Sequence, residues 1–282
     1  MGEEPAHDAY PACELPPYRA LLVVDIKDFS GRRGRHHEQL TRSVPELLKA
    51  AFTRCGLAAL LGAVCFDGTT GDGFVLGFDA KHLPALVDPF LRGLQEELAY
   101  RHRVASGHGG QPVRMRVSIN VGPMTDSGGN RLGDGSGAGR VETHRLLDSD
   151  AVRHLLDLST PTITFVAAVV SERTFEDAVA GGFTAVDPEL FVEVPVTVKS
   201  YQGRAYLYVP LPFGGLLEHG FRPAELQAGA VAGSAGRPLD ADGGVRVGGV
   251  GNVTGDIRTI VTDARGPVHA GDGSQVIHES GR

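Results

Sequence analysis

Alternating apolar runs and amphipathic segments predict interleaved strands and helices over much of this chain. A first strand is predicted at about 19–26, and the run at 162–171 is nearly continuous, which is typical of buried strands. A further strand is predicted at 113–121, and two final strands run to Val209. A hairpin is expected with its turn at Asp67–Gly73, where glycine and threonine separate two apolar segments.

Helical periodicity appears in several segments between these strands. After the first strand and a polar loop, apolar side chains recur at helical spacing at Leu40, Val44, Leu47, Leu48, Ala51 and Phe52. Residues 83–103 predict a second amphipathic helix, interrupted or restarted near Pro89 because proline lacks an amide donor. A third helix is predicted from about 140 to 157, and the short segment ERTFEDAVAGG predicts a helix that ends at glycine. This alternation predicts a sheet covered by helices on at least one face.

The ends of the chain differ from its centre in composition. With 282 residues, the chain can form one sizeable α/β domain with a tail, or two small domains. Residues 1–17 are acidic and proline-rich, so we expect a flexible leader before a domain at 18–212. Residues 213–282 predict a low-complexity tail, either disordered or built of short β segments that pair with copies of themselves.

Charge and cysteine content exclude several classes of partner. A formal net charge of −7 argues against nucleic acid, whose phosphates favour basic surfaces. The 3 cysteines form no CxxC pair and suit a reducing cytoplasm, and no histidine has metal-ligand spacing with them. No apolar stretch approaches the roughly 18 residues of a membrane helix, so we expect a cytoplasmic protein without membrane contact.

Two short strings carry the candidate chemistry: LLVVDIKDFSG at 21–31 and FDGTTGDGFVLGF at 66–78. The first places Asp25 at the end of an apolar strand, and the second places Asp72 in a turn before another. Mg²⁺ and Mn²⁺ prefer oxygen ligands and are held by one or two carboxylates together with substrate phosphates. The pair therefore predicts a metal site for a nucleoside triphosphate, where such ions assist phosphoryl displacement.

Both strings resemble the first two motifs of the class III nucleotidyl cyclases, with Asp28 where the family usually has glycine. The segment VRMRVSINVGPM (113–124) resembles the family strand R-x-G-I-x-x-G-x-V, and GSGAGRVETHRLLDS (135–149) resembles the glycine-rich turn and helix that follow. VTVKSYQGRAYLYV (196–209) resembles the closing hairpin. The chain also resembles a divergent actinobacterial group of cyclase-homology proteins, through SERTFEDAV (171–179), VDPELFVEVPVTVKSYQGRAYLYVP (186–210) and HRLLDSDAVRHLL (144–156). Covering roughly 17–212, the resemblance implies an α+β, ferredoxin-like core with a mixed, mainly antiparallel sheet and packed helices.

The resemblance also implies an active site shared by two copies of the chain. The metals, Mg²⁺ or Mn²⁺, would be held by Asp25, Asp72 and the carbonyl of Ile26. The phosphates would contact the backbone at Phe29 and Ser30, and the side chain of Lys199. Arg145 of the other protomer would stabilise attack of the 3′-hydroxyl on the α-phosphate, which releases pyrophosphate and forms a cyclic nucleotide.

Two positions depart from the family pattern. The family has an asparagine four residues before the arginine, but this chain has Val141, which cannot form a side-chain hydrogen bond. Asn130 in the preceding loop is an alternative donor. Among the base-reading positions, Asp134 is kept, while Gly68 replaces a lysine, so the choice between ATP and GTP is not predicted.

Two functions remain open at this stage. The carboxylates at Asp25 and Asp72 favour a slow or divergent nucleotidyl cyclase. Val141 and Gly68 favour an inactive nucleotide-binding or signalling module that acts through its tail in a regulatory or defence system. A phosphatase or polymerase-like palm domain shares the two-carboxylate layout, but the third and fourth motifs argue against it. The fold alone does not decide between them.

Overall fold

The computed structural model describes residues 14–29, 31, 37–69, 73–107, 111–221, 268–269 and 275–276. Two of the predicted site residues, Ser30 and Asp72, lie outside this described part of the chain. The chain divides into two compact units, Met1–Ser234 and Ala235–Arg282, and each is described by itself.

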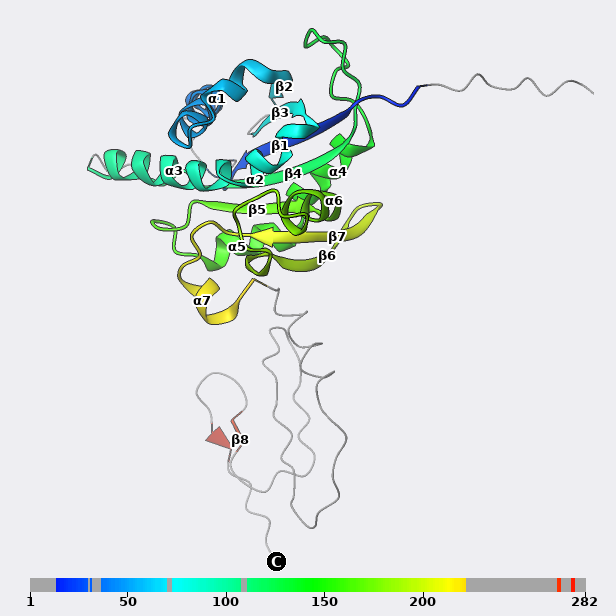
Figure 1. Cartoon of the computed structure of the whole chain (residues 1–282). Coiled ribbons are helices and arrows are strands. Elements are labelled where there is room, and N and C mark those ends of the chain that lie inside the picture. Colours follow the sequence, from blue (N-terminus) through cyan, green and yellow to red (C-terminus); the bar gives the residue numbers. More distant parts are fainter. Residues whose placement is uncertain are drawn as a thin grey trace, which may run out of the picture. The chain divides into compact units, whose positions relative to one another are not determined.

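The first unit contains a seven-stranded sheet with the strand order β2-β3-β1-β4-β5-β7-β6. Figure 1 shows β1, β4, β5 and β7 following one another across this sheet. The strands are β1 (Tyr18–Ile26), β2 (Val64–Thr69), β3 (Gly73–Asp79), β4 (Met115–Pro123), β5 (Val166–Ser171), β6 (Val192–Val198) and β7 (Tyr201–Tyr208).

The first four strands form a ferredoxin-like arrangement. The chain runs β1, helix, β2, β3, helix, β4, and these strands pair antiparallel in the order β2-β3-β1-β4. The parallel pairing of β4 with β5 then requires a crossover, and β7 and β6 complete the sheet in antiparallel pairs. The predicted α+β class, with its mixed and mainly antiparallel sheet, is confirmed.

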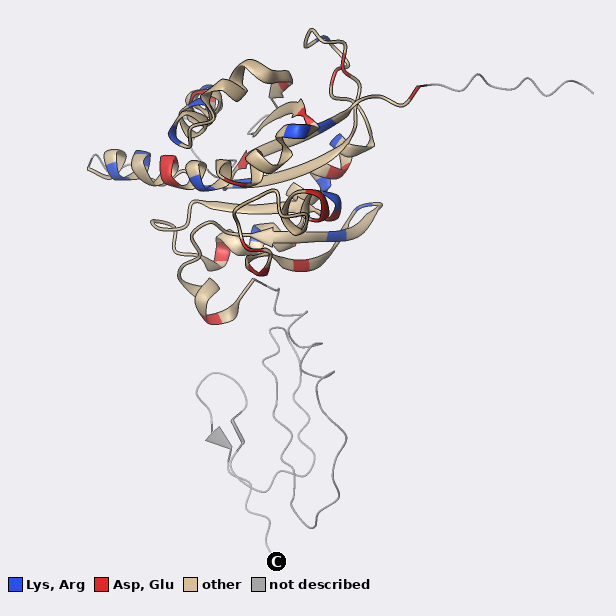
Figure 2. Cartoon of the chain, viewed as in Figure 1, with Lys and Arg blue, Asp and Glu red and all other residues tan. Residues whose placement is uncertain are grey.

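Helices cover both faces of the sheet. The helical segments are α1 (His37–Arg54), η2 (Ala58–Ala63), η3 (Ala80–His82), α2 (Leu83–Val87), α3 (Phe90–Ser106), α4 (Ala138–Leu147), α5 (Asp150–Leu158), α6 (Glu172–Thr174), the π-helical turn η4 (Phe175–Ala180), η5 (Pro188–Leu190) and α7 (Gly215–His219). One apolar core joins the sheet to α1, α2 and α3, and two smaller clusters lie under α4 and α5. The strand ribbons are mostly tan in Figure 2, because uncharged side chains fill both faces.

Strand β1 shows why the apolar runs are nearly continuous. Leu22 and Val24 point into the core beneath α1 and α3, while Leu21 and Val23 pack on the opposite face with Phe66. Because side chains alternate along a strand, Asp25 belongs to the same face as Leu21 and Val23. The end of β1 therefore presents a carboxylate on the face that α4 and α5 cover.

Two predicted boundaries are wrong. The single helix expected at 140–157 is two helices, because the backbone of Ser149 is extended (φ −65°, ψ 144°) and begins α5 anew. The strand expected from 162 begins at Val166, because the preceding residues form a turn in which the amide of Thr164 donates to the Thr160 carbonyl at 3.0 Å. The break near Pro89 is confirmed, since α2 ends at Val87 and α3 begins at Phe90.

The packed part of the chain continues past the predicted domain boundary at residue 212. Gly214 forms a β-bridge with Ser159, and Leu216 of α7 is 3% exposed in the core beneath α5. In the second unit, β8 (Val268–His269) and β9 (Gln275–Val276) form an antiparallel pair. Most of the predicted tail lies outside the described residues. Among those described, no helix has the length and apolar character needed to cross a membrane.

Candidate functional site

Asp25 and Arg116 form an ion pair at the ends of two central strands. In the ladder, Asp25 is opposite Arg116 of β4 on one side and Gly73 of β3 on the other. The Arg116 Nη2 donates to Asp25 Oδ2, and the two side chains are only 13% and 12% exposed. The predicted metal ligand on β1 is therefore held beside a guanidinium that the sequence analysis did not assign.

A cavity of about 340 Å³ opens beside this pair. Arg116 lines it and Asp25 does not, but Asp25 is ion-paired with that arginine, and we call the space the Asp25 cavity. It is bordered by the end of β1 and the turn after it, by the start of β4, and by one face of α5. Its lining residues are Ile26, Lys27, Asp28, Phe29, Arg116, Arg153 and Asp157. Two predicted contacts, Ile26 for a metal and Phe29 for phosphate, thus lie on the same cavity.

The oxygen atoms of the Asp25 carboxylate and the Ile26 carbonyl fit part of a divalent-cation site. A carboxylate and a backbone carbonyl are hard oxygen ligands, and substrate phosphates supply further oxygens when such a cation binds. In the described residues no cluster of three or more His, Cys, Asp or Glu side chains could hold a metal ion by itself. The second predicted carboxylate, Asp72, directly precedes Gly73, the ladder partner of Asp25, but lies outside the described part.

Lys27 connects the turn after β1 to helix α5. Its Nζ lies 2.9 Å from Asp28 Oδ2 and 2.7 Å from Asp157 Oδ1. Burial alone would lower the pKa of Lys27, but the hydrogen bonds to Asp157 and Asp28 outweigh it and raise the pKa above its ordinary value. Asp28 has a φ of 58°, a left-handed conformation that aspartate tolerates better than most residues.

A buried arginine fixes the far end of α5. Arg114 Nε donates to the Thr164 carbonyl at 3.0 Å, and its Nη2 donates to the hydroxyl of Ser159, the residue after the helix. Burial lowers the pKa of Arg114, and the charges of Asp157 and Asp28 partly oppose that shift. Arg114, two residues before Arg116, therefore links the end of α5 to the start of β4.

Arg145 and Val141 lie on α4 and do not line this cavity. Arg145 is half-buried, and Val141 is 58% exposed. Their spacing places both on one side of the helix. Neither member of the half-complete pair that the sequence predicts therefore borders the Asp25 cavity of its own chain.

Of the predicted base-reading residues, Asp134 lies in the loop between β4 and α4, and Gly68 lies on β2. The Asp134 carboxylate accepts hydrogen bonds from the amide and hydroxyl of Ser127 and from the amide of Arg131, and these bonds lower its pKa, the Ser127 hydroxyl most. Asn130, the alternative ribose contact, instead donates to Asp67 Oδ1 at 2.5 Å. A Cβ at Gly68 would lie 3.9 Å from Arg140 Nη2.

Lys199 is exposed in the turn between β6 and β7, with a φ of 55°. Its position in the closing hairpin is as predicted. Like Arg145, it does not line the Asp25 cavity of its own chain.

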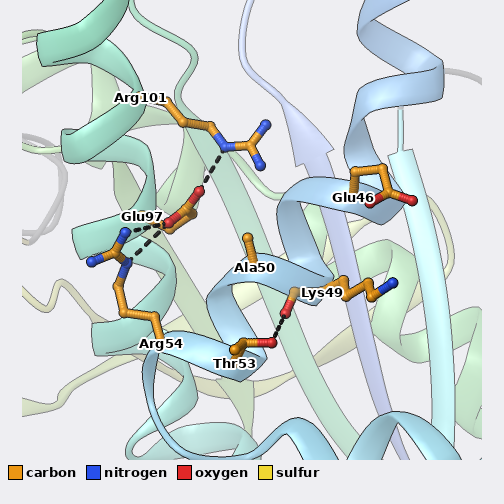
Figure 3. Close-up of a pocket in the computed structure, with 7 residues that line it drawn as sticks. All are labelled: Glu46, Lys49, Ala50, Thr53, Arg54, Glu97 and Arg101. Atoms are coloured by element: carbon orange, nitrogen blue, oxygen red, sulfur yellow. Dashed lines mark hydrogen bonds and ion pairs between the residues drawn. The ribbon is translucent and has the colours of Figure 1, made fainter.

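A larger cavity, about 610 Å³, lies elsewhere, between α1 and α3. Figure 3 shows Arg54 and Arg101 meeting the carboxylate of Glu97 from two sides. The Arg54 Nη2 and Arg101 Nε donate to it at 2.7 and 2.8 Å. Burial opposes ionisation of Glu97, but the two arginines outweigh it and lower its pKa. The Glu97 carboxylate is fully paired within the chain, and we assign this cluster to stability.

Four residues that line the Asp25 cavity were not predicted from the sequence as site residues: Lys27, Arg116, Arg153 and Asp157. Arg116 opens the segment that resembles R-x-G-I-x-x-G, and its position opposite Asp25 follows from antiparallel pairing of the two strands. Arg153 and Asp157 are four residues apart on an amphipathic helix, which places them on one face. Nothing in the sequence showed that this face meets the end of β1.

Comparisons with solved structures found cyclase domains. The guanylyl cyclase Cya2 is 19% identical, with a TM-score of 0.43 over 70% of this chain and 93% of that chain. The adenylyl cyclase CyaB from P. aeruginosa is 17% identical, with a TM-score of 0.42 over 68% and 93%. The guanylate cyclase domain of RhGC from Catenaria anguillulae, in complex with GTP, is 16% identical, with a TM-score of 0.42 over 70% and 98%. No protein-family model matches the sequence, and no curated protein matches it.

Proposed function

We propose that the chain binds a nucleoside triphosphate with Mg²⁺ or Mn²⁺ at the Asp25 cavity and converts it slowly to a 3′,5′-cyclic nucleotide and pyrophosphate. The observation that carries this proposal is the ion pair of Asp25 with Arg116, which lines a cavity together with Lys27 and Arg153. A carboxylate for a divalent cation beside several cations for phosphate is the combination that a metal-bound triphosphate requires.

In this proposal, Asp25, Asp72 and the Ile26 carbonyl hold the divalent cation, which neutralises charge on the phosphates when bound. Arg116 and Lys27 bind phosphate oxygens, and the backbone at Phe29 and Ser30 donates to them. These contacts orient the α-phosphate toward the ribose. The 3′-oxygen then bonds to the α-phosphorus as the bond to the β-phosphate oxygen breaks, and the hydroxyl proton passes to water.

Arg145 and Lys199 would act on the nucleotide of a second copy of the chain, because neither lines the cavity of its own protomer. The proposed active form is therefore a homodimer in the cytoplasm, with Arg145 stabilising charge on the transferring phosphate. Asp134 and the backbone at Gly68 would contact the base.

Exposed Val141 favours a second candidate, a nucleotide-binding module without catalysis that signals through the C-terminal segment. Valine offers no polar group to orient the ribose, so the reacting hydroxyl would lack one directed contact. The two candidates share the Asp25 cavity and differ in turnover.

The test is an incubation of the full chain with each nucleoside triphosphate and Mn²⁺, with products identified by mass spectrometry. The proposal expects a cyclic nucleotide and pyrophosphate in equal amounts, and none from Asp25→Asn. Metal-dependent binding without product would support the second candidate. Absence of both binding and product would contradict the proposed site.

A further inference from the structure

Helix α5 forms one wall of the Asp25 cavity with two residues of opposite charge. Arg153 and Asp157 are one helical turn apart, and both line the cavity. The sequence assigns no site role to either residue, and the crossover from β4 to β5 brings them to the end of β1.

The three cationic side chains of the cavity differ in how closely they are paired with carboxylates. Arg116 is paired with Asp25 in nearly closed surroundings, and the Lys27 ammonium lies between Asp28 and Asp157. Arg153 has a longer contact of 3.4 Å to Asp148, and both side chains are about half exposed, at 48% and 47%. An exposed pair at this distance adds little free energy, so Arg153 can exchange Asp148 for another anion at small cost.

Asp157, in contrast to Arg153, opposes the binding of an anion in the cavity. Its carboxylate lies 2.7 Å from the Lys27 ammonium, where a phosphate oxygen would otherwise bind, and its negative charge repels an incoming polyphosphate. With 60% of its side chain exposed, the Asp157 carboxylate can turn toward water when a more highly charged anion arrives.

We infer that Arg153 is a phosphate ligand supplied by the same chain, and that Asp157 competes with the phosphates for Lys27. This inference rests on the proposed function and extends it, since it assigns the polyphosphate of the nucleotide to a clamp between the end of β1 and helix α5. Two residues one turn apart then act on affinity in opposite directions, which a merely structural role for α5 would not produce.

The experiment is calorimetric titration of the full chain with GTP and ATP in Mn²⁺, and separately with inorganic tripolyphosphate. Arg153→Gln removes a charge-assisted hydrogen bond and is expected to weaken binding about tenfold. Asp157→Asn releases Lys27 and is expected to strengthen binding about threefold, because exposed ion pairs are weak. Arg103→Gln on α3 and Asp150→Asn at the start of α5 are matched controls, since both are exposed and neither lines the cavity.

The outcomes separate this inference from the proposed function. If wild type binds GTP or ATP and Arg153→Gln binds it equally, the inference is overturned and the nucleotide site remains. If only tripolyphosphate binds, and with the two predicted shifts, the clamp is supported and the nucleotide assignment fails. Binding of neither probe overturns both. Weaker binding by Asp157→Asn, with an unchanged thermal midpoint, also overturns the inference, because Asp157 would then assist rather than compete.

Discussion

Asp25 of β1 and Arg116 of β4 stand opposite each other in the central ladder, and their side chains form an ion pair that is nearly closed to water. The pair joins a proposed metal ligand to a proposed phosphate ligand. A divalent cation must therefore compete with the guanidinium for the Asp25 carboxylate, whereas a triphosphate can draw Arg116 toward itself.

Arg116→Gln should change the affinities for metal and for nucleotide in opposite directions. Removing a positive charge next to Asp25 should strengthen binding of Mn²⁺ alone, by about tenfold. Binding of the metal–nucleotide complex should weaken by about tenfold, because a phosphate loses a charged donor. Titrations of Mn²⁺ with and without GTP measure both quantities.

Arg19→Gln is the matched control for this prediction. Arg19 also pairs with a buried carboxylate, Asp126, at 2.7 Å, but it lies at the other end of β1. It should leave both affinities unchanged. A fall in Mn²⁺ affinity on loss of Arg116 would show that the guanidinium orients the carboxylate rather than competing for it.

Glu97→Gln should make the chain less stable at neutral pH by about 1–2 kcal/mol, because three charge-assisted hydrogen bonds from Arg54 and Arg101 are weakened. The folded-state pKa of Glu97 lies below the ordinary value of 4.5, so its contribution is full above that value and is lost as the pH falls through the lowered pKa. Urea unfolding from pH 7 to pH 3 should therefore show the wild type and the variant converging in acid. The exposed neighbour Glu96→Gln should show no such convergence, and a constant difference for Glu97→Gln would contradict the assignment.

We predict that the buried side chain of Leu216 anchors α7 to the first unit and stabilises it. Leu216→Ala should lower the free energy of unfolding by about 2–4 kcal/mol, because the side chain is buried beneath α5. The exposed neighbour Leu217→Ala should change little. A chain truncated after Phe221 keeps α7 and should unfold with the same free energy as the full chain. A chain truncated after Leu211 lacks α7 and should be less stable. Equal stability of the two truncated chains would mean that α7 is dispensable.

Val141→Asn should accelerate cyclic nucleotide formation if the chain is a slow cyclase. One oriented contact to the reacting group is worth about 3 kcal/mol, or about two orders of magnitude in rate. Val104→Asn on α3 is the control, because Val104 and Val141 are equally exposed, at 58%. A wild-type rate that is already fast and that Val141→Asn leaves unchanged would assign the ribose contact to another residue. Product from neither protein would favour the binding module.

The strand and helix pattern could be predicted from the sequence, because apolar periodicity reports local burial directly. The break at Ser149 could not, since the apolar spacing of α4 continues into α5 and only one residue changes its backbone conformation. The packing of Leu216 was missed for a related reason. A single buried leucine among glycines and exposed residues has no periodicity to detect.

For the candidate site, Asp25 and Ile26 could be found because they lie in one continuous strand and its turn. Arg116 was within reach of the same reasoning, since strand pairing places it opposite Asp25. Arg153 and Asp157 were not, because their approach to Lys27 depends on how the β4–β5 crossover sets α5 against the end of β1. Such tertiary placement leaves no local pattern in the sequence.

The most direct test of the central claim is the Mn²⁺-dependent affinity for GTP and ATP of wild type, Asp25→Asn and the control Asp150→Asn, measured by calorimetry. The account predicts that wild type and the control bind at least one nucleotide tightly only when Mn²⁺ is present. Asp25→Asn should lose the metal-dependent part while remaining folded at the temperature of the titration, although loss of the buried ion pair with Arg116 lowers its thermal midpoint. Equal Mn²⁺-dependent affinity in Asp25→Asn and wild type would contradict the claim that Asp25 holds the metal of a nucleotide site.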